Sequence, residues 1–89
     1  MIPRIRELKP QDNFRLEVTF DDGYQVVYDV LEDIRAIESY AILEQIPGMF
    51  EQVQVDSSRT CVCWNDEIDL PSDTIYEYGK AVKDTFSAE

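Results

Sequence analysis

The fold is decided by residues 14–29, which read FRLEVTFDDGYQVVYD. Apolar and polar residues alternate through residues 14–20 and again through residues 24–29, which is the pattern of two half-buried strands. A three-residue connection at residues 21–23 would align every apolar residue on one face, whereas a two-residue connection would mix polar with apolar residues. The stretch therefore predicts a β-hairpin with Gly23 in the left-handed conformation of a bulge. The predicted pairs are Phe20 with Tyr24, Val18 with Val26 and Leu16 with Tyr28.

The segments on either side of this hairpin contain one further strand and two helices. Residues 2–9 are the expected first strand, and residues 9–13 are the turn that follows it. Good helix formers without Gly or Pro fill the stretch after the hairpin, which predicts short helices near 31–36 and 40–46. Pro47-Gly48 ends the second helix, and the apolar pair that follows is expected to pack as a plug behind that turn.

A second hairpin is predicted in the last third of the chain. Val53 and Val55 begin a strand, Cys61 to Trp64 form the next one, and Asn65-Asp66 suits a two-residue loop. That loop would place both cysteines and their partners on one buried face. The expected pairs are Cys63 with Ile68 and Cys61 with Leu70. Buried structural thiols then account for both cysteines, because alternate strand residues lie too far apart for a favourable disulfide.

The last helix is expected to start at Pro71, with Ser72 or Asp73 as its cap. Its apolar positions, at helical spacing, are Ile75, Tyr78, Gly79, Val82 and Phe86. The whole pattern predicts one α+β domain over residues 1–89. We expect a small antiparallel sheet of five to six strands built from hairpins, one or two short helices in the middle and a C-terminal helix packed on the sheet.

Composition excludes several classes of function. The 89 residues carry 8 Lys+Arg, 19 Asp+Glu and no His, so the formal net charge is −11. This charge disfavours nucleic acid, which needs a basic surface, and the absence of His removes Ser-His and Cys-His nucleophiles. The sequence contains neither a glycine-rich phosphate loop nor a Gly-x-Ser-x-Gly motif, so we expect no enzymatic activity and no cofactor. Without an apolar run of membrane length or a signal peptide, a cytoplasmic protein is expected.

The candidate functional residues are carboxylates and aromatic side chains near the second hairpin. The acids there are Asp66, Glu67, Asp69 and Asp73. A calcium loop that starts at Asp66 would have Pro71 where a Gly is needed, so solvated turn acids are the simpler interpretation and a divalent-ion site stays open. Trp64 and the tyrosines line either an interface or, more simply, the core. The candidate interaction or pocket residues are Trp64, Asp69, Asp73 and Tyr76.

Charge is unevenly distributed along the chain. Residues 1–15 carry four basic and two acidic side chains, whereas residues 16–89 carry four basic and seventeen acidic ones. A basic first strand would attract the acidic remainder of a second copy, so the sequence is compatible with a homodimer. The simpler interpretation is that Arg4, Arg6 and Arg15 balance neighbouring acids within one chain.

An ordered set of residues spans positions 3 to 78: Pro3, Leu16 to Gly23, Asp29, Leu43, Phe50, Val53, Val55, Trp64, Ile68 to Leu70, Asp73 and Tyr76. This set resembles the bacterial domain of unknown function 2442 family. The resemblance implies a small α+β domain in the bacterial cytoplasm, with no defined catalytic residues. The family often has a Gly in the hairpin after the Trp, where this chain has Asn65-Asp66-Glu67, so the turn type is open there.

The same resemblance bears on partners. Family members are often encoded beside another small protein, in an arrangement similar to toxin–antitoxin pairs, and some add a C-terminal helix-turn-helix DNA-binding domain that this chain is expected to lack. We therefore expect a protein-interaction module, the neutralising partner of a co-encoded small protein, with a basic protein as its partner. The alternative is a small-ligand or ion-sensing regulatory domain without its DNA-binding half.

Overall fold

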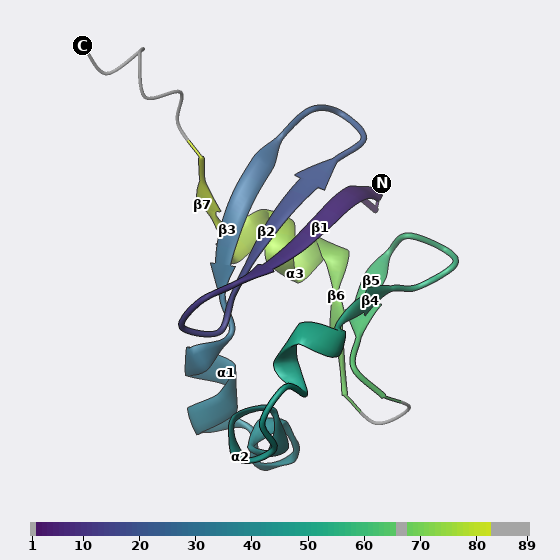
Figure 1. Cartoon of the computed structure of the whole chain (residues 1–89). Helices are drawn as coiled ribbons and strands as arrows, with labels where there is room; N and C mark the ends of the chain where they lie inside the picture. Colours follow the sequence, from purple (N-terminus) through teal and green to yellow (C-terminus); the bar gives the residue numbers. More distant parts are fainter. Residues whose placement is uncertain (1, 66–67, 83–89) are drawn as a thin grey trace, which may run out of the picture.

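A computed structural model describes residues 2–65 and 68–82 of the chain. Within these residues seven strands form two antiparallel sheets, so the expectation of one sheet with five to six strands is wrong (Figure 1). The first sheet has the order β1-β2-β3-β7 and the second has the order β4-β5-β6. The strands are β1 (Ile5–Gln11), β2 (Arg15–Phe20), β3 (Gln25–Asp29), β4 (Gln54–Val55), β5 (Cys61–Cys63), β6 (Asp69–Pro71) and β7 (Lys80–Ala81). None of the helices in the described part of the chain has the length and apolarity needed to cross a membrane.

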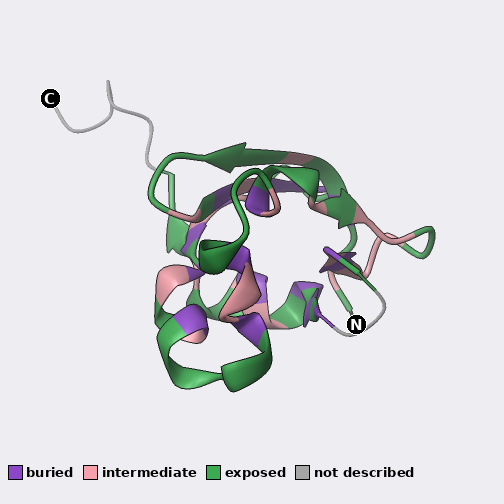
Figure 2. Ribbon diagram, turned by 60° about the horizontal axis from the view of Figure 1, so that its bottom comes forward, coloured by how far each residue is buried: buried purple, intermediate pink, exposed green. Residues whose placement is uncertain are grey.

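Short helices connect and cover the sheets, and the expected α+β class is confirmed. They are α1 (Leu31–Ala36), η1 (Glu38–Tyr40), α2 (Ile42–Gln45), η2 (Phe50–Gln52) and α3 (Ser72–Tyr78). The two helices predicted between the hairpins are present, and Phe50 is buried as the expected plug. The buried residues of both sheets and of the helices form one core cluster, and Figure 2 colours these buried segments purple.

The predicted β2–β3 hairpin is confirmed in register and in turn length. Leu16 lies opposite Tyr28, and Val18 lies opposite Val26. The hairpin closes on a hydrogen bond of 2.8 Å from the Phe20 amide to the Tyr24 carbonyl, and the turn glycine has φ +91° as expected. This register puts every large apolar residue of β2 on the core side, where it is fully buried.

The first strand differs from its prediction by its bounds and by a bulge. It runs to Gln11, so the turn predicted at residues 9–13 lies instead at residues 12–14. A register shift between Ile5 and Glu7 lets Ile5 and Leu8 both face the core, although their spacing alone would place them on opposite faces. Pro10 lacks an amide hydrogen, and it is tolerated because β1 is an edge strand.

The second hairpin is shifted by one residue from its predicted register. Val62 pairs with Leu70 and Cys63 with Asp69, and the Trp64 amide donates to the Ile68 carbonyl at 3.0 Å, so Ile68 lies opposite Trp64 and not opposite Cys63. A shift of one residue exchanges the two faces of a strand. Valine, leucine, tryptophan and isoleucine therefore fill the core, and both thiols are free and half-buried on the opposite face. The expectation of core cysteines is wrong, since the bulkier apolar residues bury more surface.

The last helix is shorter than predicted because Gly79 ends it. The amide of Gly79 donates to the Ile75 carbonyl at 2.9 Å, and the chain then becomes extended and pairs with β3 as β7. Tyr78 is consequently 70% exposed instead of buried, and Val82 donates to Gln25 in the sheet. Phe86, which was also expected in the helix, lies outside the described residues.

The predicted cap of this helix is also wrong. Pro71 occupies the N-cap position, and neither Ser72 nor Asp73 makes a capping side-chain bond. The Ser72 hydroxyl donates instead to the carbonyl of Pro3 at 2.6 Å, and the side chain is fully buried. The Ser72 side chain therefore makes a long-range hydrogen bond to Pro3 in place of the expected local capping bond.

Close packing at Gly79 gives a test of this arrangement. A Cβ added there would lie 2.9 Å from the Cβ of Val26 and 2.6 Å from the Ile75 carbonyl oxygen. Because backbone and a buried valine cannot yield easily, Gly79→Ala should lower the free energy of unfolding by about 1–3 kcal/mol. Urea denaturation measures the loss, and amide exchange at Val82 should accelerate as β7 separates from β3.

Gly48→Ala is the matched control, because a Cβ there meets nothing within 4 Å while φ is +82°. It should cost only the left-handed backbone penalty, about 1 kcal/mol, and leave exchange at Val82 unchanged. Equal exchange at Val82 in both variants would contradict the close approach of Gly79 to Val26.

Candidate functional site

Two adjoining hollows lie beside the β2–β3 turn. The larger has a volume of about 520 Å³ and is lined by Ile2, Pro3, Arg4, Phe20, Asp21, Asp22 and Thr60. The smaller has a volume of about 350 Å³ and is lined by Pro3, Asp22, Asp73, Tyr76 and Glu77. They share Pro3 and Asp22, so together they form one depression, the turn cleft, between the N-terminal segment, the turn and α3.

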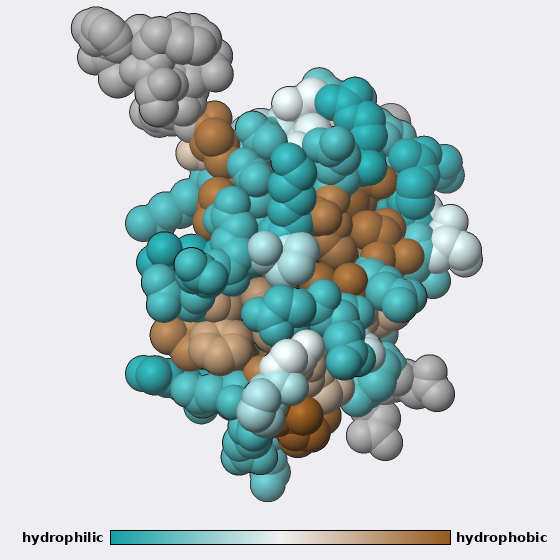
Figure 3. Space-filling model, viewed as in Figure 1, coloured by the Kyte–Doolittle hydropathy of each residue, from teal (hydrophilic) through white to brown (hydrophobic). Residues whose placement is uncertain are grey.

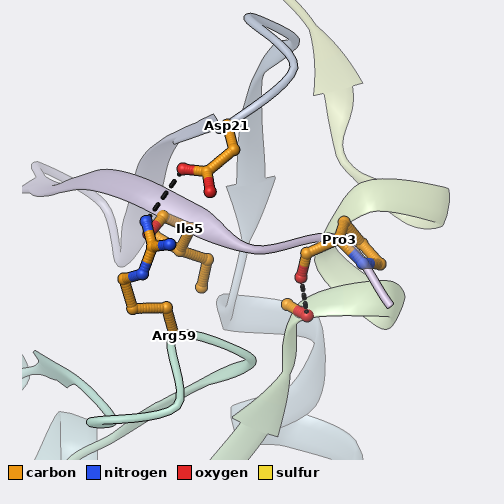
Figure 4. Close-up of polar contacts among 5 residues, drawn as sticks. Pro3, Ile5, Asp21 and Arg59 are labelled. Atoms are coloured by element: carbon orange, nitrogen blue, oxygen red, sulfur yellow. Dashed lines mark hydrogen bonds and ion pairs between the residues drawn. The ribbon is translucent and has the colours of Figure 1, made fainter. Parts of the chain in front are cut away.

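The N-terminal wall of the turn cleft is fixed by contacts with distant parts of the chain (Figure 4). The Pro3 carbonyl accepts the Ser72 hydroxyl, and the Arg4 carbonyl accepts the Asp21 amide at 2.9 Å. Arg59 crosses β1 and donates to Asp21 at 2.9 Å, where both side chains are partly exposed. The turn, the N-terminal segment and α3 are thus held in one geometry around the cleft.

Tyr76 and Asp22 form the boundary between the two hollows. The Tyr76 hydroxyl donates to Asp22 Oδ2 at 2.7 Å, and the Tyr24 amide donates to Asp22 Oδ1 at 2.9 Å. These two bonds lower the pKa of Asp22. The bond between Tyr76 and Asp22 also raises the pKa of Tyr76. The Tyr76 ring packs against Phe20 and Tyr24 with centroids 4.8 and 4.6 Å away, so its orientation is fixed.

The turn cleft is lined mostly by acidic side chains and by apolar ones. Its lining carries four carboxylates and one guanidinium. Asp73 and Glu77 are exposed and make no ion pair with any residue that the structure describes. Ile2 is 57% exposed at the other wall, and apolar atoms reach the surface beside the start of β1 (Figure 3). Such a surface suits a cationic group attached to an apolar one.

The structure separates the four candidate residues into two pairs. Asp73 and Tyr76 line the turn cleft. Trp64 is 8% exposed, and its indole donates to the Phe50 carbonyl at 3.0 Å, so it is a core residue as the simpler interpretation holds. Asp69 is exposed on β6, and its carbonyl accepts the Tyr40 hydroxyl. Trp64 and Asp69 therefore meet Tyr40 at the helical side of the core rather than the cleft.

Sequence reasoning did not select Ile2, Asp22 and Glu77 as site residues. The acidic pair at the predicted turn is a usable signal for Asp22, because turn tips are exposed.

In the described ranges, 2–65 and 68–82, no group of three or more His, Cys, Asp or Glu side chains is arranged to hold a metal ion. Asp66 and Glu67 of the acidic candidate cluster lie outside those ranges. Burial, followed by the charge of Asp56, raises the pKa of the Cys61 thiol, which disfavours a reactive thiolate.

The burial of Tyr40 predicts that its hydroxyl ionises at a higher pH than an exposed tyrosine does. Burial, and then the carboxylates of Asp33 and Asp69, raise its pKa from 10.0 to about 12. Above pH 10.0 the unfolded chain binds fewer protons than the folded one, so the free energy of unfolding falls as the pH rises towards 12. Phenolate absorbance of the wild type minus that of Tyr40→Phe should show the delayed step.

The urea-unfolded chain is the control, since its difference curve should have the ordinary tyrosine midpoint. A folded-state midpoint at 10.0 would contradict the burial of the Tyr40 hydroxyl.

The comparison with known proteins identifies a family and no close relative. No curated protein and no solved structure matches the chain significantly. The model of one family, described as protein of unknown function (DUF2442), matches residues 5–81. That range contains both sheets and α3 with its Gly79 stop. Because the match covers most of the sequence, the chain belongs to the DUF2442 family.

Proposed function

We propose that this protein is an interaction module that binds a basic protein partner at the turn cleft. The observation that carries the proposal is that Asp73 and Glu77, beside the apolar lining of the cleft, make no ion pair with any residue that the structure describes. Charged groups of this kind steer a partner of opposite sign and set its orientation, while apolar contact supplies affinity. The net charge of −11 adds long-range attraction for a cationic surface.

The rigidity of the cleft supports protein binding as well. Asp22 and Tyr76 hold each other, and Pro3 is anchored to α3, so these groups have little conformational entropy left to lose on binding. The neighbouring gene in the genome supplies the first partner to test, because many family members are encoded beside another small protein. In this proposal the acidic module covers a basic functional surface of that partner and neutralises it in the cytoplasm.

The test measures binding of the purified neighbouring gene product by calorimetry at two salt concentrations. Asp73→Asn combined with Glu77→Gln should weaken the complex about three- to thirtyfold, because each exposed charge pair contributes a few tenths to 1 kcal/mol. The salt dependence of the affinity should decrease in the same variant, since fewer charges are paired. Neither side chain makes a hydrogen bond or ion pair in the described structure, so the fold should be retained.

Glu38→Gln combined with Glu44→Gln is the matched control. Both residues are exposed on the helical side, and the variant changes the net charge by the same amount. It should bind almost as the wild type does. An equal loss in both double variants would show that net charge alone matters and would overturn the cleft as the site, and absence of any complex would count against the proposed role itself.

A further inference from the structure

A larger hollow lies at the opposite end of the first sheet from the β2–β3 turn. Its volume is about 640 Å³, within the range of small-molecule sites. It is formed by β2, β3 and β7 on one side and by α1 and α3 on the other. The lining residues are Arg15, Val27, Tyr28, Asp29, Glu32, Asp33, Thr74, Tyr78 and Lys80.

Two basic and three acidic side chains line this hollow, and one of the acids, Asp29, lies at the end of β3, where its Oδ1 accepts the Leu31 amide at 3.0 Å. Arg15 and Lys80 belong to the sheet, at β2 and β7, whereas Glu32 and Asp33 belong to α1. No ion pair among the described residues uses any of these four side chains. Arg15 lies opposite Asp29 in the strand register, yet their side chains are not within ion-pair distance of each other. Both walls therefore keep charge available for a ligand.

The acidic wall is partly fixed in position. The Tyr28 hydroxyl donates to Asp33 Oδ2 at 2.6 Å, and Tyr28 itself is buried. Burial and this bond raise the pKa of Tyr28, so it keeps its proton and continues to donate. In the described part of the chain the Asp33 carboxylate makes no other hydrogen bond, and the Glu32 carboxylate makes none. One oxygen of Asp33 and the whole Glu32 carboxylate thus remain free to accept.

An apolar surface lies beside these charges. Val27 is half-buried on the sheet, and the Tyr78 ring is 70% exposed on the last turn of α3, directly before the Gly79 stop. Thr74 stands one turn earlier on the same helix. A ligand that lies in the hollow would cover the Tyr78 ring, which otherwise projects into water.

We propose that this hollow binds a free α-amino acid as a zwitterion, with its carboxylate at Arg15 and Lys80, its ammonium group at Glu32 and Asp33, and its side chain against Tyr78. A ligand with only one charge would satisfy one wall and bring that charge near like charges on the other. Charge-assisted bonds at both ends make the zwitterion the better fit. This ligand site is separate from the turn cleft and does not depend on a protein partner.

Calorimetry with each common L-amino acid, offered singly to the full chain, tests the proposal. At least one apolar or aromatic amino acid should bind at millimolar concentration or below and raise the melting temperature, because a ligand of the native state stabilises it. Its N-acetyl derivative and its amide should each bind at least about tenfold more weakly, since each has lost one charged contact. Failure of every amino acid, or equal binding of the blocked forms, would overturn the proposal.

Two single variants locate the site. Arg15→Gln should reduce affinity about tenfold and weaken the preference for a free carboxylate, and Glu32→Gln should do the same for the free amine. Arg35→Gln and Glu44→Gln make the same changes at exposed positions that do not line the hollow, and they should bind as the wild type does. Loss of affinity in all four variants, or in neither member of the first pair, would show that the amino acid binds elsewhere.

Discussion

The rest of the structure depends on the crossing of the N-terminal segment from one sheet to the other. The Ile5 amide donates to the Arg59 carbonyl at 2.8 Å, so β1 is tied to the loop between β4 and β5. Ser72 extends the connection, since its amide donates to Thr60 at 2.8 Å and its hydroxyl donates to Pro3. Sheets of such short strands are marginal alone, so these bonds let both sheets share one core.

A strained residue at this crossing shows how strongly the junction is determined. Arg59 has φ +63°, a left-handed conformation that costs a residue with a side chain roughly 1–2 kcal/mol. That conformation is compensated by three contacts: its carbonyl accepts from Ile5, its amide donates to Asp56, and its guanidinium pairs with Asp21. The same crossing places the N-terminal segment over the β2–β3 turn, and the turn cleft is therefore a consequence of how the two sheets are joined.

The sequence could predict elements whose stabilising partners are close in the chain. The β2–β3 hairpin is determined by the alternation of apolar and polar residues and by one glycine, so its register follows from sixteen residues.

Elements that depend on distant partners are harder to predict. The predicted register of the second hairpin is wrong by one residue, because its short strands fit two pairings and only the shared core selects Val62 over the cysteines. The end of α3 does not follow from the local sequence for a similar reason, since the chain after Gly79 pairs with β3 and Gly79 lies close to Val26, fifty-three positions earlier. Asp73 and Tyr76 were selected, but their neighbour Asp22 is 54 positions from Tyr76 and no local pattern pairs them.

The net charge of the chain does not by itself determine which ligand each surface favours. At physiological ionic strength the field of an exposed charge decays over about 8 Å, so a ligand responds mainly to the side chains that line its own site. At the turn cleft four carboxylates face one guanidinium, and local and net charge agree in favouring a cation. In the hollow between α1 and β7, Arg15 and Lys80 lie on the sheet together with Asp29, and Glu32 and Asp33 lie on α1, so side chains of both signs line one small hollow. A simple anion approaching that wall still meets the −11 of the whole chain, whereas a zwitterion carries no net charge and is not repelled. The side chains that line each surface, more than the overall acidity, thus favour a cation at one end of the first sheet and a zwitterion at the other.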